Sequence, residues 1–146
     1  MTTSTRSFAF ALAAAAALAL AGCSDTCPTE SPGVERVQSC TYPPGAAVTM
    51  QVRVCEKCNQ SATTCQVDIQ GSTIQLDPVS EACEDASSCS VPGCNLTPNV
   101  SCSFTAPSAV GTYTVLVYDS ATNSTKSGTL VVAAGASPSC TFPTFR

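Results

Sequence analysis

Cysteine is the residue type with the greatest chemical potential in this sequence, and histidine is absent. The chain of 146 residues contains eleven Cys, no His and no Trp. Without an imidazole it cannot build a Ser-His-Asp triad, a Cys-His pair, the paired-histidine zinc motif of metalloproteases or a Cys/His zinc site. No Ser lies in a Gly-x-Ser-x-Gly motif, so hydrolase chemistry also lacks support. The sequence predicts a protein that is not an enzyme and needs no cofactor.

The Cys-x-x-Cys pair formed by Cys55 and Cys58 is the strongest catalytic candidate. Such a pair exchanges thiols with disulfides when one thiol has a low pKa, typically at a helix N-terminus. Here the pair ends an expected strand and enters a polar loop over residues 59–64, with no β-α-β pattern around it. We favour structural bridges to distant partners, with a clip from Cys55 to Cys65 as one arrangement. A periplasmic thiol oxidoreductase that uses Cys55 and Cys58 is kept as an alternative.

Two groups of residues have side chains that suit metal ions. The closely spaced thiols are those of Cys83, Cys89 and Cys94. They lack the two Cys-x-x-Cys knuckles of a zinc ribbon, and an oxidising compartment favours disulfides. The carboxylates are those of Glu81, Glu84 and Asp85. They lack the Asp-x-Asp-x-Asp-Gly spacing of a calcium loop, so we predict a solvated loop and no bound metal.

The number of cysteines and the scarcity of charge indicate an exported chain held together by disulfides. Charged residues make up only 11% of the chain, well below the usual quarter. Setting Cys23 aside leaves an even number of thiols, which can close five bridges. The expected structural half-cystines are Cys27, Cys40, Cys55, Cys58, Cys65, Cys83, Cys89, Cys94, Cys102 and Cys140. Each bridge contributes about 2–4 kcal/mol, which is large beside the stability of a small domain.

The first 22 residues predict a cleaved signal peptide. Arg6 precedes an uncharged run over residues 7–22 that is rich in Ala and Leu and too short for a spanning helix with charged flanks. The run ends in Leu-Ala-Gly-Cys at residues 20–23, which resembles the lipobox of bacterial lipoproteins. This resemblance implies cleavage before Cys23, a diacylglycerol on its thiol and, usually, acylation of the new amino group. Because Ser24 rather than Asp follows, it also implies transfer to the outer membrane or cell surface.

Two observations support other interpretations of this region. The segment before Cys23 also suits the general signal peptidase, which would make Cys23 an ordinary half-cystine in a secreted, unanchored Cys-rich binding or inhibitor protein. All four Asn residues lie in Asn-x-Ser/Thr patterns, as in glycosylated eukaryotic proteins: Asn59, Asn95, Asn99 and Asn123. The abundance of Ser and Thr makes such patterns frequent by chance.

The remaining chain reads as a tether over residues 23–40 and one all-β domain over residues 41–146. Alternating apolar and polar residues predict strands at 48–54, 67–70, 73–76 and 100–104, and a β-prone run of Thr, Tyr and Val predicts a strand at 111–118, followed by another at 129–132. Gly71 and Ser72 predict a hairpin turn between the second and third of these. Residues 119–128 are predicted to form a polar loop. Residues 77–98 are predicted to form a cross-linked loop, which is the predicted place of contact with a partner. We expect these strands to form an antiparallel two-layer β-sandwich, which would bury the apolar face of each strand.

The last part of the chain is similar to bacterial immunoglobulin-like domains. Phe-Thr-Ala-Pro at residues 104–107, then Gly-Thr-Tyr-Thr-Val at 111–115 and a final strand, look like the closing three strands of that family. The resemblance covers residues 100–132 and implies an immunoglobulin-like sandwich. It also implies that the hydroxyl of Tyr113 bonds back to the preceding corner. Antibody domains have a Cys two positions after this Tyr, where this chain has Val115, so the resemblance does not imply the usual disulfide between the two sheets. Cys65 and Cys102 nevertheless both lie on segments that resemble strands.

Together these patterns predict a cell-envelope lipoprotein that displays a non-catalytic binding or structural module. Its partners would be the membrane, through the lipid on Cys23, and a protein or polysaccharide of the envelope. The formal charge of −4 provides no electrostatic footprint for nucleic acid.

Overall fold

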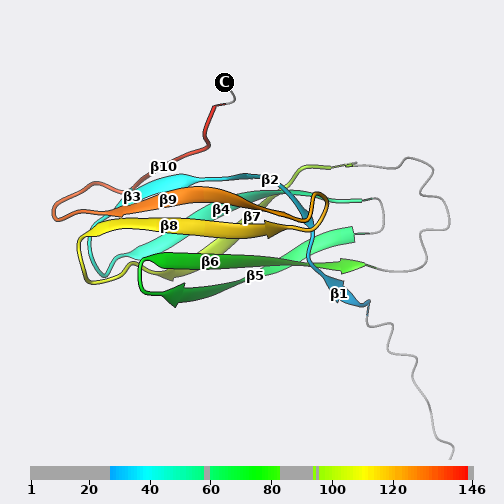
Figure 1. Ribbon diagram of the computed structural model, residues 1–146, viewed down its shortest axis with the longest axis horizontal. Helices are drawn as coiled ribbons and strands as arrows, with labels where there is room; N and C mark the ends of the chain where they lie inside the picture. Colours follow the sequence, from blue (N-terminus) through cyan, green and yellow to red (C-terminus); the bar gives the residue numbers. More distant parts are fainter. Residues whose placement is uncertain (1–26, 58–59, 83–93, 95, 145–146) are drawn as a thin grey trace, which may run out of the picture.

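A computed structural model describes residues 27–57, 60–82, 94 and 96–144, which form two β-sheets (Figure 1). The larger sheet has the order β1-β6-β8-β9-β3-β10, and β5 pairs with the other side of β6. It comprises β1 (Thr29–Glu30), β3 (Ser39–Tyr42), β5 (Gln60–Gln70), β6 (Thr73–Ala82), β8 (Gly111–Asp119), β9 (Ser124–Val132) and β10 (Ser139–Thr141). The smaller sheet has the order β2-β4-β7 and comprises β2 (Gly33–Val37), β4 (Ala47–Cys55) and β7 (Asn99–Thr105). The all-β prediction is confirmed.

The core lies between the sheets and follows from the period of two along each strand. On β4 the buried residues alternate with more exposed polar ones, and the same holds along β6, β8 and β9. Most of the buried apolar side chains are β-branched, as suits a pleated surface. The largest fully buried apolar side chains are Met50, Ile74, Leu76, Leu130, Val37, Val48, Val52, Val54, Val115, Val117 and Val132. Within the described residues, no helix is long and apolar enough to cross a membrane.

Each of the six predicted strands is present, and the predicted hairpin is confirmed. β5 and β6 pair with Gln70 opposite Thr73, and the turn between them contains Gly71 at a φ of +59°. Glycine adopts this left-handed conformation without the steric penalty that other residues meet. Both strands extend well beyond their predicted bounds. For β5 the reason is that it lies at a sheet edge, where a strand needs few apolar residues, so its first half shows no alternating pattern.

The prediction of a structureless tether up to residue 40 differs from the structure. β2 and the start of β3 lie in this segment, and Val34, Val37 and Cys40 are buried in the core. The sequence pattern was hidden by a β-bulge, because the register of β2 on β4 shifts between Val34 and Arg36. The extra residue turns Val34 and Val37 to the same face although they are three positions apart.

Two predicted loops are also shorter than expected. β6 continues to Ala82, so the predicted loop over residues 77–98 is wrong at its start, where buried Pro78 and Ser80 continue the inward face. β9 begins at Ser124, so the polar loop over 119–128 is reduced to residues 120–123. Its inward face carries Gly128, where a Cβ atom would lie 2.4 Å from the carbonyl oxygen of Gln38. Because a glycine occupies this inward position, the sequence lacks the apolar residue that would have extended the alternating pattern and predicted the start of β9.

The sheets are not wholly antiparallel, which corrects the predicted pairing. β3 runs parallel to β9, and β6 runs parallel to β8. The chain between β6 and β8 crosses to the other sheet to form β7, and this long connection permits a parallel pair. Alternation along single strands predicts which face is buried, but it does not predict the direction of a neighbour.

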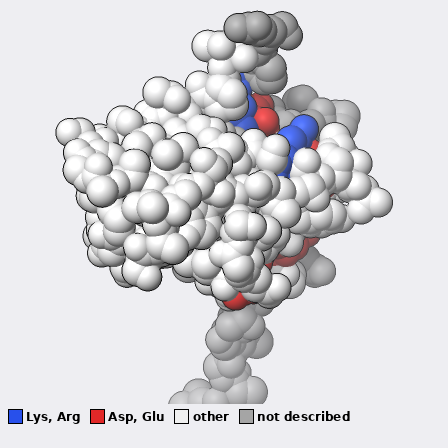
Figure 2. Space-filling model, turned by 60° about the vertical axis from the view of Figure 1, so that its left-hand side comes forward, with Lys and Arg blue, Asp and Glu red and all other residues white. Residues whose placement is uncertain are grey.

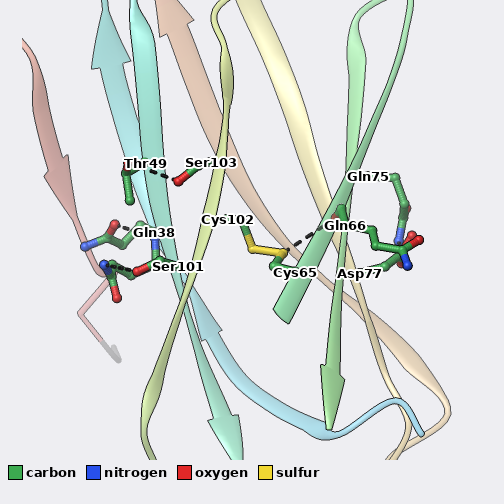
Figure 3. Close-up of a disulfide and its surroundings, with 10 residues drawn as sticks. Gln38, Thr49, Cys65, Gln66, Gln75, Asp77, Ser101, Cys102 and Ser103 are labelled. Atoms are coloured by element: carbon green, nitrogen blue, oxygen red, sulfur yellow. Dashed lines mark hydrogen bonds between the residues drawn. A yellow bond between two sulfur atoms is a disulfide. The ribbon is translucent and has the colours of Figure 1, made fainter. Parts of the chain in front are cut away.

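Disulfides are present as predicted, and the pairing is new information. Cys40 bonds to Cys140, Cys55 to Cys94, and Cys65 to Cys102. Cys65 on β5 and Cys102 on β7 join the two sheets, as Figure 3 shows. The clip from Cys55 to Cys65 that the sequence suggested is therefore excluded. Cys27 is disulfide-bonded as well.

Candidate functional site

The two ends of the sandwich differ, and the chemically richer one is the candidate functional site. The turns over residues 43–46, 71–72, 106–110 and 133–138 meet at one end and contain no charged residue; we call it the uncharged end. At the opposite end, β2 starts, β4 finishes and the β8–β9 turn closes the sheet. We call this the cleft end, because two adjoining clefts open there.

The two clefts share three lining residues, Gly33, Cys55 and Ala121. One has a volume of about 400 Å³ and is also lined by Glu30, Ser31, Lys57, Gln60 and Ser120. The other has a volume of about 390 Å³ and is also lined by Val34, Glu35, Arg36, Cys94, Asp119, Thr122 and Lys126. Gly33 makes this arrangement possible, since a Cβ atom there would lie 3.1 Å from the Cβ of Ala121.

Charge is concentrated at the cleft end. The structure describes four basic side chains, and three of them, Arg36, Lys57 and Lys126, line the clefts. The fourth, Arg53, lies on the outer face of the smaller sheet over the ring of Phe142. Figure 2 brings the other end of the molecule forward, and most of the surface in that view carries no charge. The cleft end therefore offers basic side chains that the turns of the uncharged end lack.

Asp119 is the best-connected side chain of the cleft end, although only 2% of its surface is exposed. Its carboxylate accepts hydrogen bonds from the backbone N–H groups of Val34 at 3.0 Å and Ala121 at 3.1 Å. The hydroxyl of Thr122 donates to it at 2.5 Å, and the ammonium group of Lys126 lies 3.5 Å away. Val34 belongs to the smaller sheet and Asp119 to the larger, so this carboxylate ties the two sheets together.

The pKa of Asp119 is set by opposing effects. Burial raises the pKa of the carboxyl, because it disfavours the charged form. The hydrogen bonds from Thr122, Val34 and Ala121, together with the charge of Lys126, outweigh burial and hold the pKa below its usual value of 3.8. Asp119 is therefore charged at neutral pH, and its charge is balanced from within the protein.

The Cys55–Cys94 bridge joins the end of β4 to the segment that leads into β7. Cys94 is exposed and Cys55 half-buried, so both clefts give access to this bond. Beside it, the backbone of Glu56 exchanges hydrogen bonds with that of Leu96 at 3.0 and 3.4 Å. The largely buried Glu56 carboxylate accepts the N–H of Ala62 at 2.6 Å. This network orders the cleft wall around the disulfide.

The structure brings some of the predicted site residues together. Cys55 and Cys94 are bonded to each other, so Cys55 is not bonded to Cys58, and Cys94 does not contribute a free thiolate to a zinc site. Glu81 is an exposed residue of β6. Several predicted positions lie outside the described residues: Cys23, Cys58, Cys83, Glu84, Asp85 and Cys89. The described residues contain no group of three or more His, Cys, Asp or Glu side chains able to hold a metal ion.

Sequence reasoning missed the residues that shape the clefts, including Gly33, Asp119 and Lys126. Asp119 was assigned to a loop, although it occupies the fourth inward position after Tyr113, Val115 and Val117. A carboxylate at the end of an inward-facing row is a signal that was available in the sequence.

A second cluster of polar groups lies on the larger sheet, away from the cleft end. A cleft of about 300 Å³ is lined there by Asp68, Gln70, Thr73 and Gln75 on β5 and β6. Asp68 gives this cleft a carboxylate, but these residues include neither a basic side chain nor a cysteine, so the cleft lacks the mixture of charges found at the cleft end.

Comparison of the chain with models of protein families, with curated proteins and with solved structures finds no match. The functional argument therefore depends on the clefts and on the residues around them.

Proposed function

We propose that this chain is a cell-envelope lipoprotein whose sandwich is a non-catalytic binding module, with the cleft end as its contact site. The observation that carries the proposal is the coincidence of two adjoining clefts with three of the four described basic side chains. Loops and turns at one end of a rigid scaffold are a common place for binding residues. Ligand sites are typically concave and present a few fixed polar groups, as these clefts do.

The proposed location outside the cytosol is supported by the cysteines. All seven described cysteines are in disulfides, which persist in oxidising compartments and are rare in the cytosol. A lipid on Cys23 and on its amino group would then hold the protein at the bilayer, since two or three acyl chains give durable attachment.

An immunoglobulin-like classification is part of the proposal. The hydroxyl of Tyr113 donates to the carbonyl of Ala109 at 2.9 Å, which is the corner hydrogen bond that the resemblance implied. The antiparallel β8–β9 pair and the inter-sheet Cys65–Cys102 bridge also suit such a domain. The parallel β6–β8 pair is a departure, because the strand beside the penultimate strand of that fold runs antiparallel to it.

The binding proposal is tested with two matched tryptophan variants at exposed turn residues. Ser120→Trp places a bulky ring at the cleft end, and Ser108→Trp places the same ring at the uncharged end. Purified proteins are immobilised and exposed to solubilised envelope proteins and to purified envelope polysaccharide. We expect Ser120→Trp to lose most of the material that the wild type retains, and Ser108→Trp to keep it. Equal retention by both variants would contradict the cleft as the contact site.

The anchor is tested by expression of the full chain with its own signal peptide in a Gram-negative host. We expect the mature wild type to begin at an acylated Cys23 and to partition into detergent, and Cys23→Ser to lose both properties. Mass spectrometry of the N-terminus identifies the alternative, a secreted protein without a lipid.

A further inference from the structure

The N-terminal segment enters the sandwich at the cleft end. β1 pairs with Ser80 and Glu81 near the end of β6, and the N–H of Ala82 donates to the carbonyl of Pro28 at 2.9 Å. Cys27, the preceding residue, is disulfide-bonded. In Figure 1, β1 lies toward the same end as the turn between β8 and β9. The chain is therefore fastened to the sandwich from Pro28 onward, at one end.

Only five residue steps separate Pro28 from Cys23. Fully extended, they span at most about 18 Å. The other end of β6, at Thr73, lies nine residues along the strand from Ala82, which corresponds to about 30 Å. Thr73 follows directly on the turn over residues 71–72, which belongs to the uncharged end.

We propose that the cleft end faces the bilayer and that the uncharged end points away from it. This inference rests on the lipid anchor at Cys23 proposed above. A connection of about 18 Å cannot let the uncharged end, about 30 Å from the attachment point, rest end-on on the membrane. The clefts are held near the headgroup layer instead, so that an envelope protein or polysaccharide meets them beside the polar surface of the bilayer.

The chemistry of the cleft end suits this position. Lys57 is exposed, and Lys126 is partly exposed at 38% of its side-chain surface. The charge of Asp119 is balanced by its hydrogen bonds and by the ammonium group of Lys126, and Glu56 is largely buried. Lys57 is therefore available to lipid phosphates, and the exposed carboxylate of Glu35 is available to the amino groups of zwitterionic lipids.

The orientation is measured with the same two tryptophan variants, because the wild-type chain has no Trp. Mature lipidated Ser120→Trp and Ser108→Trp are reconstituted into phosphatidylethanolamine and phosphatidylglycerol vesicles that carry a dansyl-labelled headgroup lipid. Energy transfer from tryptophan to dansyl falls steeply with distance. We expect several-fold more transfer from Ser120→Trp than from Ser108→Trp, and none from either variant when Cys23→Ser is added. Equal unfolding midpoints in urea serve as the control for folding.

The possible results separate the orientation from the anchor. If both variants co-sediment with vesicles but transfer is equal, or greater from Ser108→Trp, the orientation is wrong while the anchor stands. If the mature wild type does not co-sediment with vesicles, the anchor is wrong, and the orientation is overturned with it.

Discussion

The cleft end and the uncharged end of the sandwich close the same two sheets by different means. At the uncharged end, Gly45, Gly71 and Gly135 have φ values between +59° and +71°, and the turns are held by backbone hydrogen bonds and by the bond from the Tyr113 hydroxyl to the carbonyl of Ala109. At the cleft end, the turn after β8 is organised by the side chain of Asp119, and the wall is fastened by the Cys55–Cys94 bridge. The turns of the uncharged end depend mainly on backbone conformation, and the cleft end depends mainly on side-chain interactions.

This difference explains why the charged and reactive side chains are found at the cleft end. A turn built on glycine and backbone hydrogen bonds needs no charged or reactive side chain, and the uncharged end has none. A turn built on a buried carboxylate requires partners of opposite charge and donors aimed at it. The cleft end therefore gathers polar groups first for stability, and these same groups line the concave surface proposed to bind.

The largest expected effect is at Asp119. Asp119→Ala removes the acceptor for the N–H groups of Val34 and Ala121, and it leaves the N–H of Val34 unpaired in a buried site. We expect the free energy of unfolding to fall by about 4 kcal/mol. Urea titration measures it. As a control, Asp77→Ala removes an exposed carboxylate from β6 and should change the free energy of unfolding by less than about 0.5 kcal/mol. A similar loss in both variants would contradict the conclusion that Asp119 stabilises the fold through its buried hydrogen bonds.

The next effect is at the Cys55–Cys94 bridge, which spans 39 residues of sequence. Replacing both cysteines with Ser should lower the free energy of unfolding by about 3 kcal/mol. In the wild type, mild reduction followed by alkylation and mass spectrometry should label Cys55 and Cys94 before Cys65 and Cys102. The reason is exposure, because Cys102 is fully buried and Cys94 is exposed. Simultaneous labelling of both bridges would mean that the cleft end opens only with the core.

A smaller effect is expected from acid. The pKa of Asp119 is lowered in the folded protein, so this group stabilises the fold at pH values above its unfolded pKa of about 3.9. That contribution is lost as the pH falls through the folded pKa. Comparison of wild type with Asp119→Asn, by urea unfolding between pH 6 and about pH 2, should show their difference in stability shrinking toward the acid end. A constant difference would contradict the lowered pKa.

The smallest effect is at the uncharged end. Gly71→Ala places a side chain in open space, with no atom within 4 Å, so its only penalty is the left-handed backbone. We expect a loss of about 1 kcal/mol, and a smaller loss for Gly71→Asn, since Asn tolerates this conformation better. Thermal unfolding checks both. A loss as large as that of Asp119→Ala would remove the distinction between the two ends.

Much of the fold could be predicted from alternation along single strands. Buried apolar side chains occupy every second position from Val48 to Val54 and from Tyr113 to Val117, and the structure confirms both segments as strands. β2 and the first half of β9 were missed, because a bulge breaks the period in one and a glycine replaces the apolar residue in the other. Of the candidate site, Cys55 and Cys94 were singled out separately, but their bond to each other was not foreseen.

By itself the sequence determined that the chain is all-β, that cysteines staple it and that imidazole chemistry is absent, because composition and periodicity are local properties. Only the tertiary structure decided which thiols pair, that two pairs of strands run parallel, and that Gly33, Cys55 and Ala121 meet in one cleft. These outcomes depend on contacts between residues distant in the chain. Spacing along one strand carries no information about them.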